Sequence, residues 1–415
     1  MKFLFLVHRI PYPPDKGDKI RSFNEIKYLS KNHEIHLACL VDNPDDLKYV
    51  NHLRKYCKIV NVAFINSKIT KFKAIFCLLD KKPLSVSYFY SKKLQKAINY
   101  LLLTNNYDAI ICFSSPMAEY IFKSTNQPIN QSTKLIMDFV DIDSDKWKQY
   151  AKYTKWPFSW IYKLESKRLA QYEKKVAQIF HYSIFVSKKE AKLFYMQNPD
   201  IRNILAIPNG VDFDYFNPYH FSTNNLSQPT TQSTNRPINP STSYPMLLFT
   251  GAMDYYANVD GVVWFCKNIF PQLIKKFPEL RFYIVGHNPA STIKEWANHQ
   301  VIVTGYVEDI RPYYQMATIY VAPLRIARGI QNKILEAMAM AKPVVSTSKA
   351  FEGIEATPNK DLLLADSEKE FIEKITGLLQ NPEKRKSLGI SARQTVEKNY
   401  SWQYNLKILE EILAS

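Results

Sequence analysis

The most informative stretch of the sequence reads Val321-Ala-Pro-Leu-Arg-Ile-Ala-Arg-Gly-Ile-Gln-Asn-Lys-Ile-Leu-Glu-Ala-Met-Ala-Met-Ala-Lys-Pro-Val-Val345. A strand-like run ends at Pro323, and a basic loop that contains one glycine follows it. A helix is predicted to begin near Gln331, because a periodic apolar pattern starts there, and it leads into a second strand at Pro343–Ser346. Strands that alternate with helices in this way predict an α/β domain.

The loop and the first turns of this helix have the chemistry of a diphosphate site. A helix N-terminus behind a glycine presents free backbone N–H groups and the positive end of the helix dipole. Arg325, Arg328 and Lys333 add positive charge and hydrogen-bond donors for phosphate oxygens. Glu336, further along the helix, suits the hydroxyl groups of a ribose. The alternative is that any one of these cations is a solvated surface charge and that Glu336 is a surface or capping carboxylate.

This stretch resembles the donor-binding motif of the family 4 retaining glycosyltransferases, which reads Glu-Gly-Phe-Gly, four residues, Glu-Ala-Met-Ala. Glu336 matches the second glutamate of the motif, and Gly329 matches the glycine after the first. The chain departs from the motif at two places, where Arg328 replaces the first glutamate and Gln331 replaces the second glycine.

Two further runs, His8–Ser22 and Gly251–Asp260, are similar to one bacterial subgroup, the sugar transferases associated with PEP-CTERM/exosortase exopolysaccharide loci. The resemblance covers nearly the whole chain apart from two polar inserts. It implies a B-type glycosyltransferase (GT-B) fold, which is α/β with two Rossmann-like domains facing a central cleft. It also implies that a hexosyl group is transferred, with retention, from a nucleoside-diphosphate sugar.

Apolar runs along the chain fit two such domains. Strands of the first domain are predicted at Phe3–Val7, His33–Leu40, Ile59–Phe64, Ala109–Phe113 and Lys134–Phe139. Strands of the second domain are predicted at Met246–Thr250, Arg281–Val285, Val301–Thr304, Ile319–Ala322, Pro343–Ser346 and Leu362–Leu364. We therefore expect an acceptor domain over residues 1–212, a polar linker over 213–245 and a nucleotide-sugar domain over 246–398. Residues 399–415 are expected to form a helix that packs back on the first domain.

The resemblance also implies which residues bind the donor. These are Gly17, Gly251, Gly305, Tyr306, Val307, Gly329, Ile330, Gln331, Asn332 and Glu336, and Arg325 is added to them for its charge. The loop at Gly251 lacks the Arg and Lys that the family commonly places there. We therefore expect Arg325, Arg328 and Lys333 to supply the missing positive charge. Gly17 keeps the pattern of a loop near the donor phosphates, although a plain strand-to-helix turn would look similar.

Four residues are the predicted catalytic set, namely Arg328, Lys333, Asp138 and His8. Many family members carry a histidine after a middle strand of the first domain, where it contacts the transferred sugar. Here the corresponding place contains Asp138 and Asp141, and His8 at the end of the first strand is another candidate; for His8 a structural role is the alternative. Asp141 and Asp143 could hold a divalent metal, but helix capping explains them better. No cofactor and no obligatory metal are expected.

The charge balance points to anionic partners. The 415 residues include 55 Lys and Arg against 38 Asp and Glu, a formal net charge of +17. Lysines and aromatic residues are interleaved at Lys68–Lys82 and Lys146–Lys163, which suits an anionic membrane surface or, alternatively, a solvated basic face. No nucleic-acid module accompanies the charge. Scattered cysteines and the absence of a long apolar run indicate a cytoplasmic protein, peripheral at most to the inner face of the plasma membrane.

The leading hypothesis is thus a glycosyltransferase that extends a glycan or a polyprenyl-linked saccharide in exopolysaccharide or cell-surface polysaccharide biosynthesis. The alternative is a catalytically inactive protein that binds a sugar nucleotide within a polysaccharide assembly system, because two motif positions have changed. A dinucleotide-dependent oxidoreductase is excluded, since that class needs a Gly-x-Gly-x-x-Gly turn after a strand and the chain has none.

Overall fold

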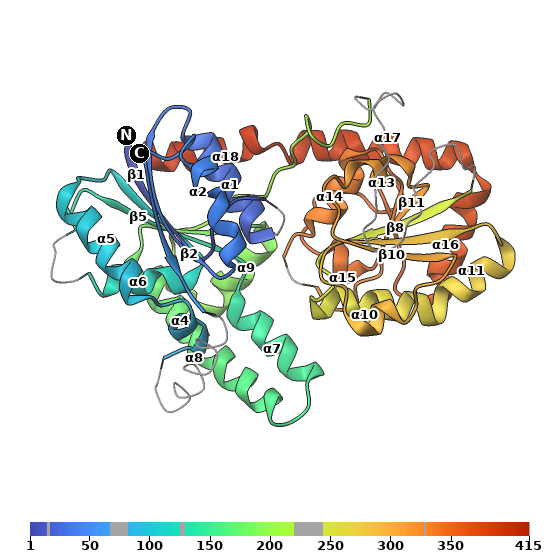
Figure 1. Cartoon of the computed structure of the whole chain (residues 1–415), viewed down its shortest axis with the longest axis horizontal. Helices are drawn as coiled ribbons and strands as arrows, with labels where there is room; N and C mark the ends of the chain where they lie inside the picture. Colours follow the sequence, from blue (N-terminus) through green and yellow to red (C-terminus); the bar gives the residue numbers. More distant parts are fainter. Residues whose placement is uncertain (15–16, 67–81, 125–128, 220–243, 328, 415) are drawn as a thin grey trace. The chain divides into compact units, whose positions relative to one another are not determined.

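The computed structural model describes residues 1–14, 17–66, 82–124, 129–219, 244–327 and 329–414 (Figure 1). Internal contacts divide the chain into two compact units. The first unit comprises Met1–Pro208 together with Trp402–Ser415, and the second comprises Asn209–Ser401. Most of the basic segment Lys68–Lys82 and of the polar linker lies outside the described residues.

The first unit is built on a parallel sheet whose order, over the described residues, is β3-β2-β1-β4-β5-β6-β7. The strands are β1 (Lys2–Val7), β2 (Glu34–Val41), β3 (Ile59–Phe64), β4 (Ala109–Phe113), β5 (Lys134–Val140), β6 (Tyr182–Phe185) and β7 (Ile204–Ala206). The strand order changes direction between β1 and β4. Open α/β sheets bind their ligands beyond the carboxyl ends of the strands at such a switch point.

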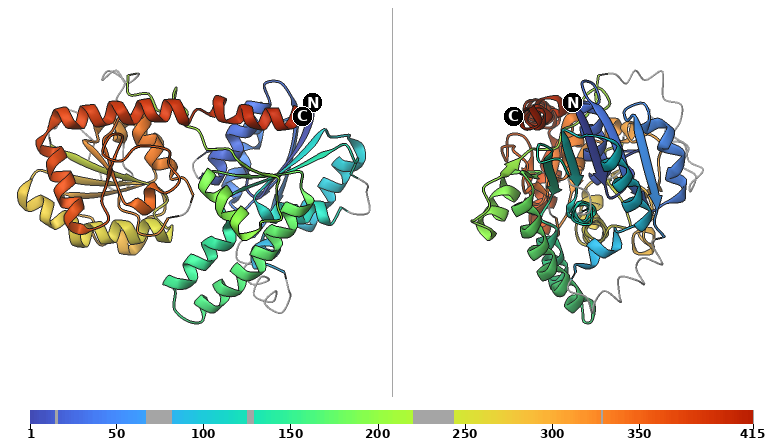
Figure 2. Two further views of the ribbon diagram at one scale, coloured as in Figure 1. Left: turned by 180° about the vertical axis from the view of Figure 1, so that it is seen from behind. Right: turned by 90° about the vertical axis from the view of Figure 1, so that its left-hand side faces the viewer.

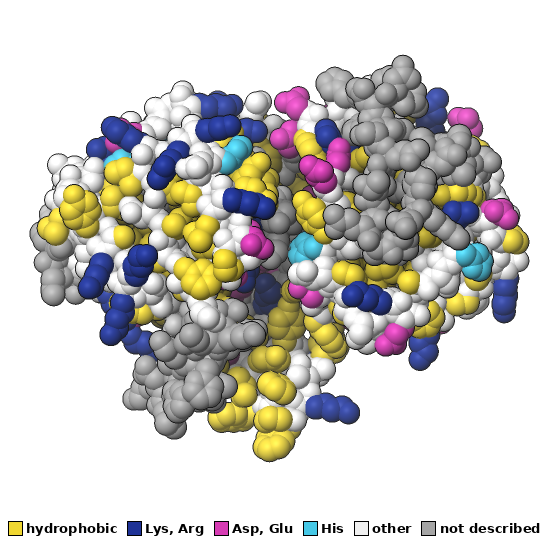
Figure 3. Space-filling view, in the orientation of Figure 1, with side chains coloured by type: hydrophobic (Ala, Val, Ile, Leu, Met, Phe, Trp, Pro, Cys, Tyr) yellow, Lys and Arg dark blue, Asp and Glu magenta, His cyan; other side chains and the backbone are white. Residues whose placement is uncertain are grey.

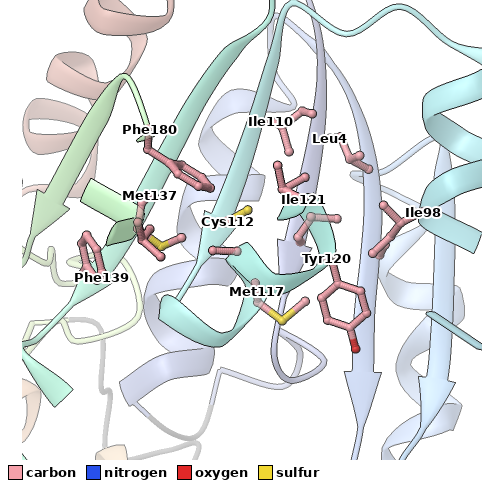
Figure 4. Close-up of a cluster of buried hydrophobic side chains, with 14 of the residues drawn as sticks. Leu4, Ile98, Ile110, Cys112, Met117, Tyr120, Ile121, Met137, Phe139 and Phe180 are labelled. Atoms are coloured by element: carbon pink, nitrogen blue, oxygen red, sulfur yellow. The ribbon is translucent and has the colours of Figure 1, made fainter. Parts of the chain in front are cut away.

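Helices cover both faces of this sheet (Figures 1 and 2). They are α1 (Gly17–Leu29), η1 (Pro44–Tyr49), α2 (Val50–Leu53), α4 (Leu84–Tyr88), α5 (Lys92–Thr104), η3 (Ser115–Met117), α6 (Ala118–Phe122), α7 (Asp143–Tyr153), α8 (Phe158–Ile179), α9 (Lys188–Gln197) and α18 (Trp402–Ala414). Strand β1 shows how the two faces are divided. Leu4 packs in one buried cluster with Ile98 of α5 (Figure 4), whereas Phe3 packs in another with Leu406 of α18. Successive side chains of a strand point to opposite faces, so an unbroken apolar run serves both layers.

The C-terminal helix α18 belongs to the first unit although it ends the chain. It packs against α1, and Leu406, Leu409 and Leu413 are buried with side chains of β1. The hydroxyl of Tyr28 on α1 donates to Glu410 Oε2 on α18 at 2.8 Å.

The second unit repeats the architecture with the order β10-β9-β8-β11-β12-β13 among the described residues. Its strands are β8 (Met246–Thr250), β9 (Arg281–Val285), β10 (Val301–Gly305), β11 (Ile319–Ala322), β12 (Val344–Ser346) and β13 (Leu363–Leu364). Its helices are α10 (Tyr256–Trp264), η5 (Phe265–Ile269), α11 (Phe270–Lys276), α12 (Ser291–Lys294), α13 (Arg311–Met316), α14 (Asn332–Ala339), α15 (Ser348–Phe351), α16 (Glu368–Gln380) and α17 (Pro382–Asn399). The switch point lies between β8 and β11.

The predicted fold class, α/β with two Rossmann-like sheets, is confirmed. Each predicted strand is present to within a residue or two, but β6 and β7 were not predicted. Both are short, and β7 is an edge strand with partly exposed side chains, so neither forms the long apolar run that identifies a buried strand. In the described part of the chain, no helix combines the length and apolar character needed to cross a bilayer.

Two helical glycines of the second unit provide a matched test of its packing. An added Cβ at Gly389 in α17 would lie 2.1 Å from the carbonyl oxygen of Ala341, whereas a Cβ at the exposed Gly377 in α16 would have no neighbour within 4 Å. We predict that Gly389→Ala lowers the free energy of unfolding by about 1–3 kcal/mol through overpacking. Gly377→Ala should raise it by about 0.5–1 kcal/mol through helix propensity. Calorimetric unfolding checks both, and equal effects of the two changes would contradict this packing.

Candidate functional site

The carboxyl edge of the second sheet is formed by closely approaching glycines. Gly251, directly after β8, donates its N–H to Val285 O at 3.0 Å, and Gly286, directly after β9, donates to Gly305 O at 3.2 Å. A Cβ on Gly286 would lie 1.7 Å from the carbonyl oxygen of Gly251. The backbones can approach this closely because Gly286 has no side chain.

Helix α14 begins beside this edge, after the loop that follows β11. Gly329 in that loop has φ 67°, a left-handed conformation that glycine adopts without strain. Gln331 is the N-cap residue, and its side chain makes no capping hydrogen bond to the first turn of α14. The partly exposed Asn332 accepts a hydrogen bond on Oδ1 from Asn209 Nδ2 at 2.9 Å. The Gln331 side chain therefore leaves the backbone N–H groups of this first turn uncapped, and they can bind a ligand. Arg328, predicted to be catalytic, lies outside the described residues.

Lys333, in the first turn of α14, reaches back to the glycine edge. Its Nζ donates to Asn258 Oδ1 at 2.6 Å and lies 4.6 Å from the ring centroid of Phe249. A Cβ on Gly251 would lie 2.9 Å from this Nζ, so a glycine at position 251 leaves room for the ammonium. Burial lowers the pKa of Lys333 to about 7, although the charge of Glu336 acts in the opposite direction.

Glu336 ends a chain of hydroxyl groups that come from β8, α13 and β11. Tyr314 OH donates to Glu336 Oε2 at 3.0 Å, Thr250 Oγ1 lies 3.0 Å from Tyr314 OH, and it also lies 3.0 Å from Tyr320 OH. Burial raises the pKa values of Tyr314 and Tyr320, so both remain protonated donors. Burial also raises the pKa of Glu336, while the hydrogen bond from Tyr314 and the charge of Lys333 oppose that shift. The network fixes the carboxyl group of Glu336 one turn beyond Lys333.

Arg325 has a partner of its own. Its guanidinium forms a two-point ion pair with Asp260 of α10, with Nε 2.9 Å from Oδ2, and lies over the ring of Trp264. Its side chain is 49% exposed, so this pair is largely solvated. Arg325 is thus directed to Asp260 of α10 in this structure, whereas Lys333 is directed to Asn258 of the same helix, beside Gly251.

The loop Gly305–Val307 lies at the end of β10. Gly305 has φ 72°, and Tyr306 behind it is exposed. A second ion pair stands nearby in sequence, where Arg311 binds Asp309 at 2.7 Å and its guanidinium lies 4.2 Å from the ring centroid of Tyr215.

In the first unit, His8 lies at the end of β1 and is held on both sides of its ring. Its Nε2 lies 3.2 Å from Asp18 Oδ2 and its Nδ1 lies 3.4 Å from the carbonyl oxygen of Phe113. Asp18 directly follows Gly17, the first residue of α1, and also accepts from Arg9 at 3.1 Å. Although burial opposes the shift, hydrogen bonds and charges from His8 and Arg9 hold the pKa of Asp18 well below its usual range.

Asp138, the other predicted sugar contact, is engaged inside the first unit. Its Oδ2 accepts from Arg21 Nε at 2.7 Å, and its Oδ1 accepts from the backbone N–H of Val140 at 2.9 Å. Arg21 is fully buried, donates also to Ile207 O at 2.8 Å, and lies 3.2 Å from Glu25 Oε1. Both oxygens of Asp138 thus already have partners, and the bond from Arg21 holds β5 and α1 together.

Asp141 and Asp143, the metal alternative, stand at the start of α7. Asp143 is the first residue of that helix and lies 3.8 Å from Lys146. Over the described ranges, no group of three or more His, Cys, Asp or Glu side chains is placed to hold a metal ion.

Comparisons with known proteins agree with this architecture. Residues 244–381 match the family model described as "Glycosyl transferases group 1". A relative, "Uncharacterized 44.6 kDa protein in cps region" of Klebsiella pneumoniae, is 22% identical over 407 residues, which is 94% of each chain.

Solved structures are similar over nearly the whole chain. Sucrose-phosphate synthase (tll1590) from Thermosynechococcus elongatus has a TM-score of 0.72 at 15% identity, covering 99% of this chain and 98% of that one. Anabaena Alr3699/HepE, in complex with UDP-glucose, has a TM-score of 0.69 at 15% identity, covering 100% and 99%. The fold is therefore GT-B. Within it, the residues that match the group 1 glycosyl transferase model include Gly251, Lys333 and Glu336.

Sequence reasoning missed Asn258, Thr250, Tyr314 and Tyr320. Asn258 lies in the run Gly251–Asp260 that was expected to be near the donor phosphates. Its amide could therefore have been identified from the sequence as a candidate site residue. The hydroxyl network gave no such signal, since its members are up to 86 positions apart in the sequence.

The pKa of Lys333 leads to a calorimetric prediction. Near pH 8 the buried amine is largely neutral, because its pKa is about 7, and a bound diphosphate would favour the ammonium form. UDP binding at pH 8 should therefore take up about one proton per site. Isothermal titration in buffers of different ionisation enthalpy measures this number.

Lys333→Met should abolish the proton uptake and weaken binding at least about tenfold. Lys294→Met, at an exposed position of α12, is the matched control and should leave both quantities unchanged. Undiminished proton uptake in Lys333→Met would show that another group titrates.

Asp138 leads to a prediction about stability. Asp138→Ala leaves the buried guanidinium of Arg21 without its shortest ion pair, so the first unit should lose about 3–5 kcal/mol of unfolding free energy. The double change Arg21→Met with Asp138→Leu should lose less, because it removes this ion pair, and burial raises the pKa of the remaining Glu25, which favours its neutral form. Urea unfolding of the single and double variants provides the measurement. An Asp138→Ala protein that keeps wild-type stability but loses activity would instead make Asp138 a sugar contact.

Proposed function

We propose that the protein is a retaining glycosyltransferase of the hexosyl-transferring type. It moves a sugar from a nucleoside diphosphate to a glycan or to a polyprenyl-linked saccharide, in the assembly of exopolysaccharide or another cell-surface polysaccharide. The donor binds to the second unit without an obligatory metal. The enzyme works in the cytoplasm, at the inner face of the plasma membrane.

The observation that carries this proposal is the placement of Lys333 in the first turn of α14. Its ammonium is partly buried beside Gly251 and is hydrogen-bonded to the neutral amide of Asn258. A buried cation normally has an anionic partner, and the lowered pKa indicates that the charge is only partly compensated. A diphosphate at the start of α14 supplies the missing negative charge.

The same placement suits the chemistry of sugar transfer. As the bond from the anomeric carbon to the diphosphate breaks, negative charge develops on the departing oxygen. Lys333 and the backbone N–H groups at the start of α14 are donors already in place for that charge, and such donors each contribute about 3–4 kcal/mol to catalysis. Glu336, one turn beyond, accepts hydrogen bonds from the ribose hydroxyls.

The comparisons support a choice of donor to test first. The HepE structure is a complex with UDP-glucose, so UDP-sugars are the first donors to try for this chain. The Klebsiella relative is named for a cps region, in line with a role in a polysaccharide locus.

The test begins with nucleotide binding. We predict that one of UDP, GDP, ADP, dTDP and CMP raises the unfolding temperature, with magnesium and equally with EDTA. At about 100 times its dissociation constant the ligand should add roughly 2.7 kcal/mol to the stability of the unit that binds it. Glu336→Gln should reduce the shift, whereas Glu383→Gln, at an exposed position of α17, should not. A shift that needs magnesium would refute the metal-independent site.

Turnover is then tested without knowledge of the acceptor. The matching α-linked nucleotide sugar is incubated with enough protein to release the sugar by hydrolysis faster than it mutarotates, and proton NMR follows the anomer formed. Retention predicts that the α anomer appears first, and Lys333→Met should slow its release at least about a hundredfold. The β anomer as first product would show inversion. Tight nucleotide binding without any hydrolysis or transfer would favour the inactive binding partner instead.

A further inference from the structure

Helices α7 and α8 form a hairpin that projects from the first unit (Figures 1 and 2). Helix α7 ends at Tyr153, α8 begins at Phe158, and the two pack closely along their length. Trp147 of α7 lies 5.1 Å from Tyr162 of α8 between ring centroids, so aromatic contacts hold the two helices together.

The far end of this hairpin, residues 152–160, exposes large aromatic side chains. Trp156 is 82% exposed, Tyr153 is 58% exposed, Phe158 is 56% exposed and Trp160 is 54% exposed. Figure 3 shows hydrophobic side chains gathered over the hairpin. Aromatic side chains normally bury most of their surface, so an exposed group of them marks a contact surface.

The charge around these aromatics has a single sign. Residues 146–163 contain five lysines and neither aspartate nor glutamate. Lys148, Lys152, Lys155 and Lys163 are exposed. Lysine is depleted in the cores of protein–protein interfaces, whereas lysines around Trp and Tyr are typical of segments that lie at the surface of an anionic bilayer.

We infer that the end of the α7–α8 hairpin binds the surface of an anionic lipid bilayer. The rings of Trp156, Phe158 and Trp160 enter the headgroup region, and the lysines beside them pair with lipid phosphates. Charge complementarity favours an anionic bilayer over a second copy of the chain, because a second copy would bring the same cations to the contact.

Hydrogen bonds tie the start of α7 to α8 and α9. Ser144 donates its backbone N–H to Glu173 Oε1 at 3.1 Å, and Ile142 donates to Glu190 Oε2 at 3.1 Å. Helix α7 starts directly after the carboxyl end of β5 and has 11 residues, which corresponds to a length of about 16 Å. Bilayer contact would hold this sheet edge about that far from the lipid surface. That this distance brings a lipid-linked acceptor to the sheet edge rests on the proposed function, whereas the bilayer contact itself does not.

Vesicle sedimentation of the full chain tests the inference. Vesicles of phosphatidylcholine with about a third of phosphatidylglycerol should bind the protein, and Trp156→Ser with Trp160→Ser should weaken the partition at least about tenfold. The control is Tyr100→Ser with Leu103→Ser, which removes two exposed apolar side chains of α5 and should change the partition less than about twofold.

The lysines are tested separately. Lys152→Gln with Lys155→Gln should weaken binding to the anionic vesicles and leave binding to pure phosphatidylcholine unchanged, and higher salt should have the same effect. Circular dichroism melting confirms that the variants fold.

Two outcomes would overturn the inference. One is an equal loss of vesicle binding in the α5 control. The other is self-association of the wild type in analytical ultracentrifugation that the Trp156→Ser and Trp160→Ser changes abolish, which would make a second copy the occupant. UDP binding, measured in parallel, tests the proposed function independently, because the vesicle assay uses no nucleotide.

Discussion

The carboxyl edge of the second sheet depends on how closely two backbones approach each other. There is no space for a side chain at position 286, because a Cβ there would overlap the carbonyl oxygen of Gly251. Gly251 in turn leaves no space for a side chain beside Asn258 and the ammonium of Lys333. Each glycine thus makes room for the next group, and the last group in the series is a cation at the start of α14. A side chain at position 251 would displace Asn258 or the ammonium, and one at position 286 would displace the backbone of Gly251.

The two units treat a buried cation differently. Arg21 in the first unit has a carboxylate at 2.7 Å and a carbonyl oxygen at 2.8 Å, and although burial opposes the shift, the charges of Asp138 and Glu25 raise its pKa. Lys333 in the second unit has a neutral amide as its hydrogen-bond partner, and burial lowers its pKa. A compensated charge stabilises a fold, whereas a charge that is only partly compensated costs stability and is expected where a ligand completes the site. The contrast separates a structural ion pair from a binding group without any appeal to similarity.

Sequence patterns predicted the sheets well because most strands are unbroken apolar runs buried on both faces. They did not predict β6 and β7, which are too short to show such a run. Within the site, the start of α14 and the position of Glu336 could be predicted from local sequence, because the glycine, the N-cap and the apolar periodicity all lie within a few residues. The ion-pair partners of the cations could not be predicted in this way. Asp260, which pairs with Arg325, lies 65 positions away, and Asp138 lies 117 positions from Arg21. Only folding brings such pairs together, so a sequence motif can identify a cation but not its counterion.

The fold itself explains only part of the amino-acid composition of the α7–α8 hairpin. Acidic residues in the first turn of α7 and Lys152 in its last turn agree with the helix dipole, which favours that order of charges in any helix. Trp147 and Tyr162 are explained by their contact between the two helices. Trp156 is explained by neither the dipole nor this contact, since it lies in the turn that joins the two helices and is largely exposed to solvent. An exposed indole gains little free energy in water, whereas its amphipathic ring is stabilised where headgroups meet acyl chains. The aromatic residues at the end of the hairpin, more than its lysines, therefore require a partner outside the chain.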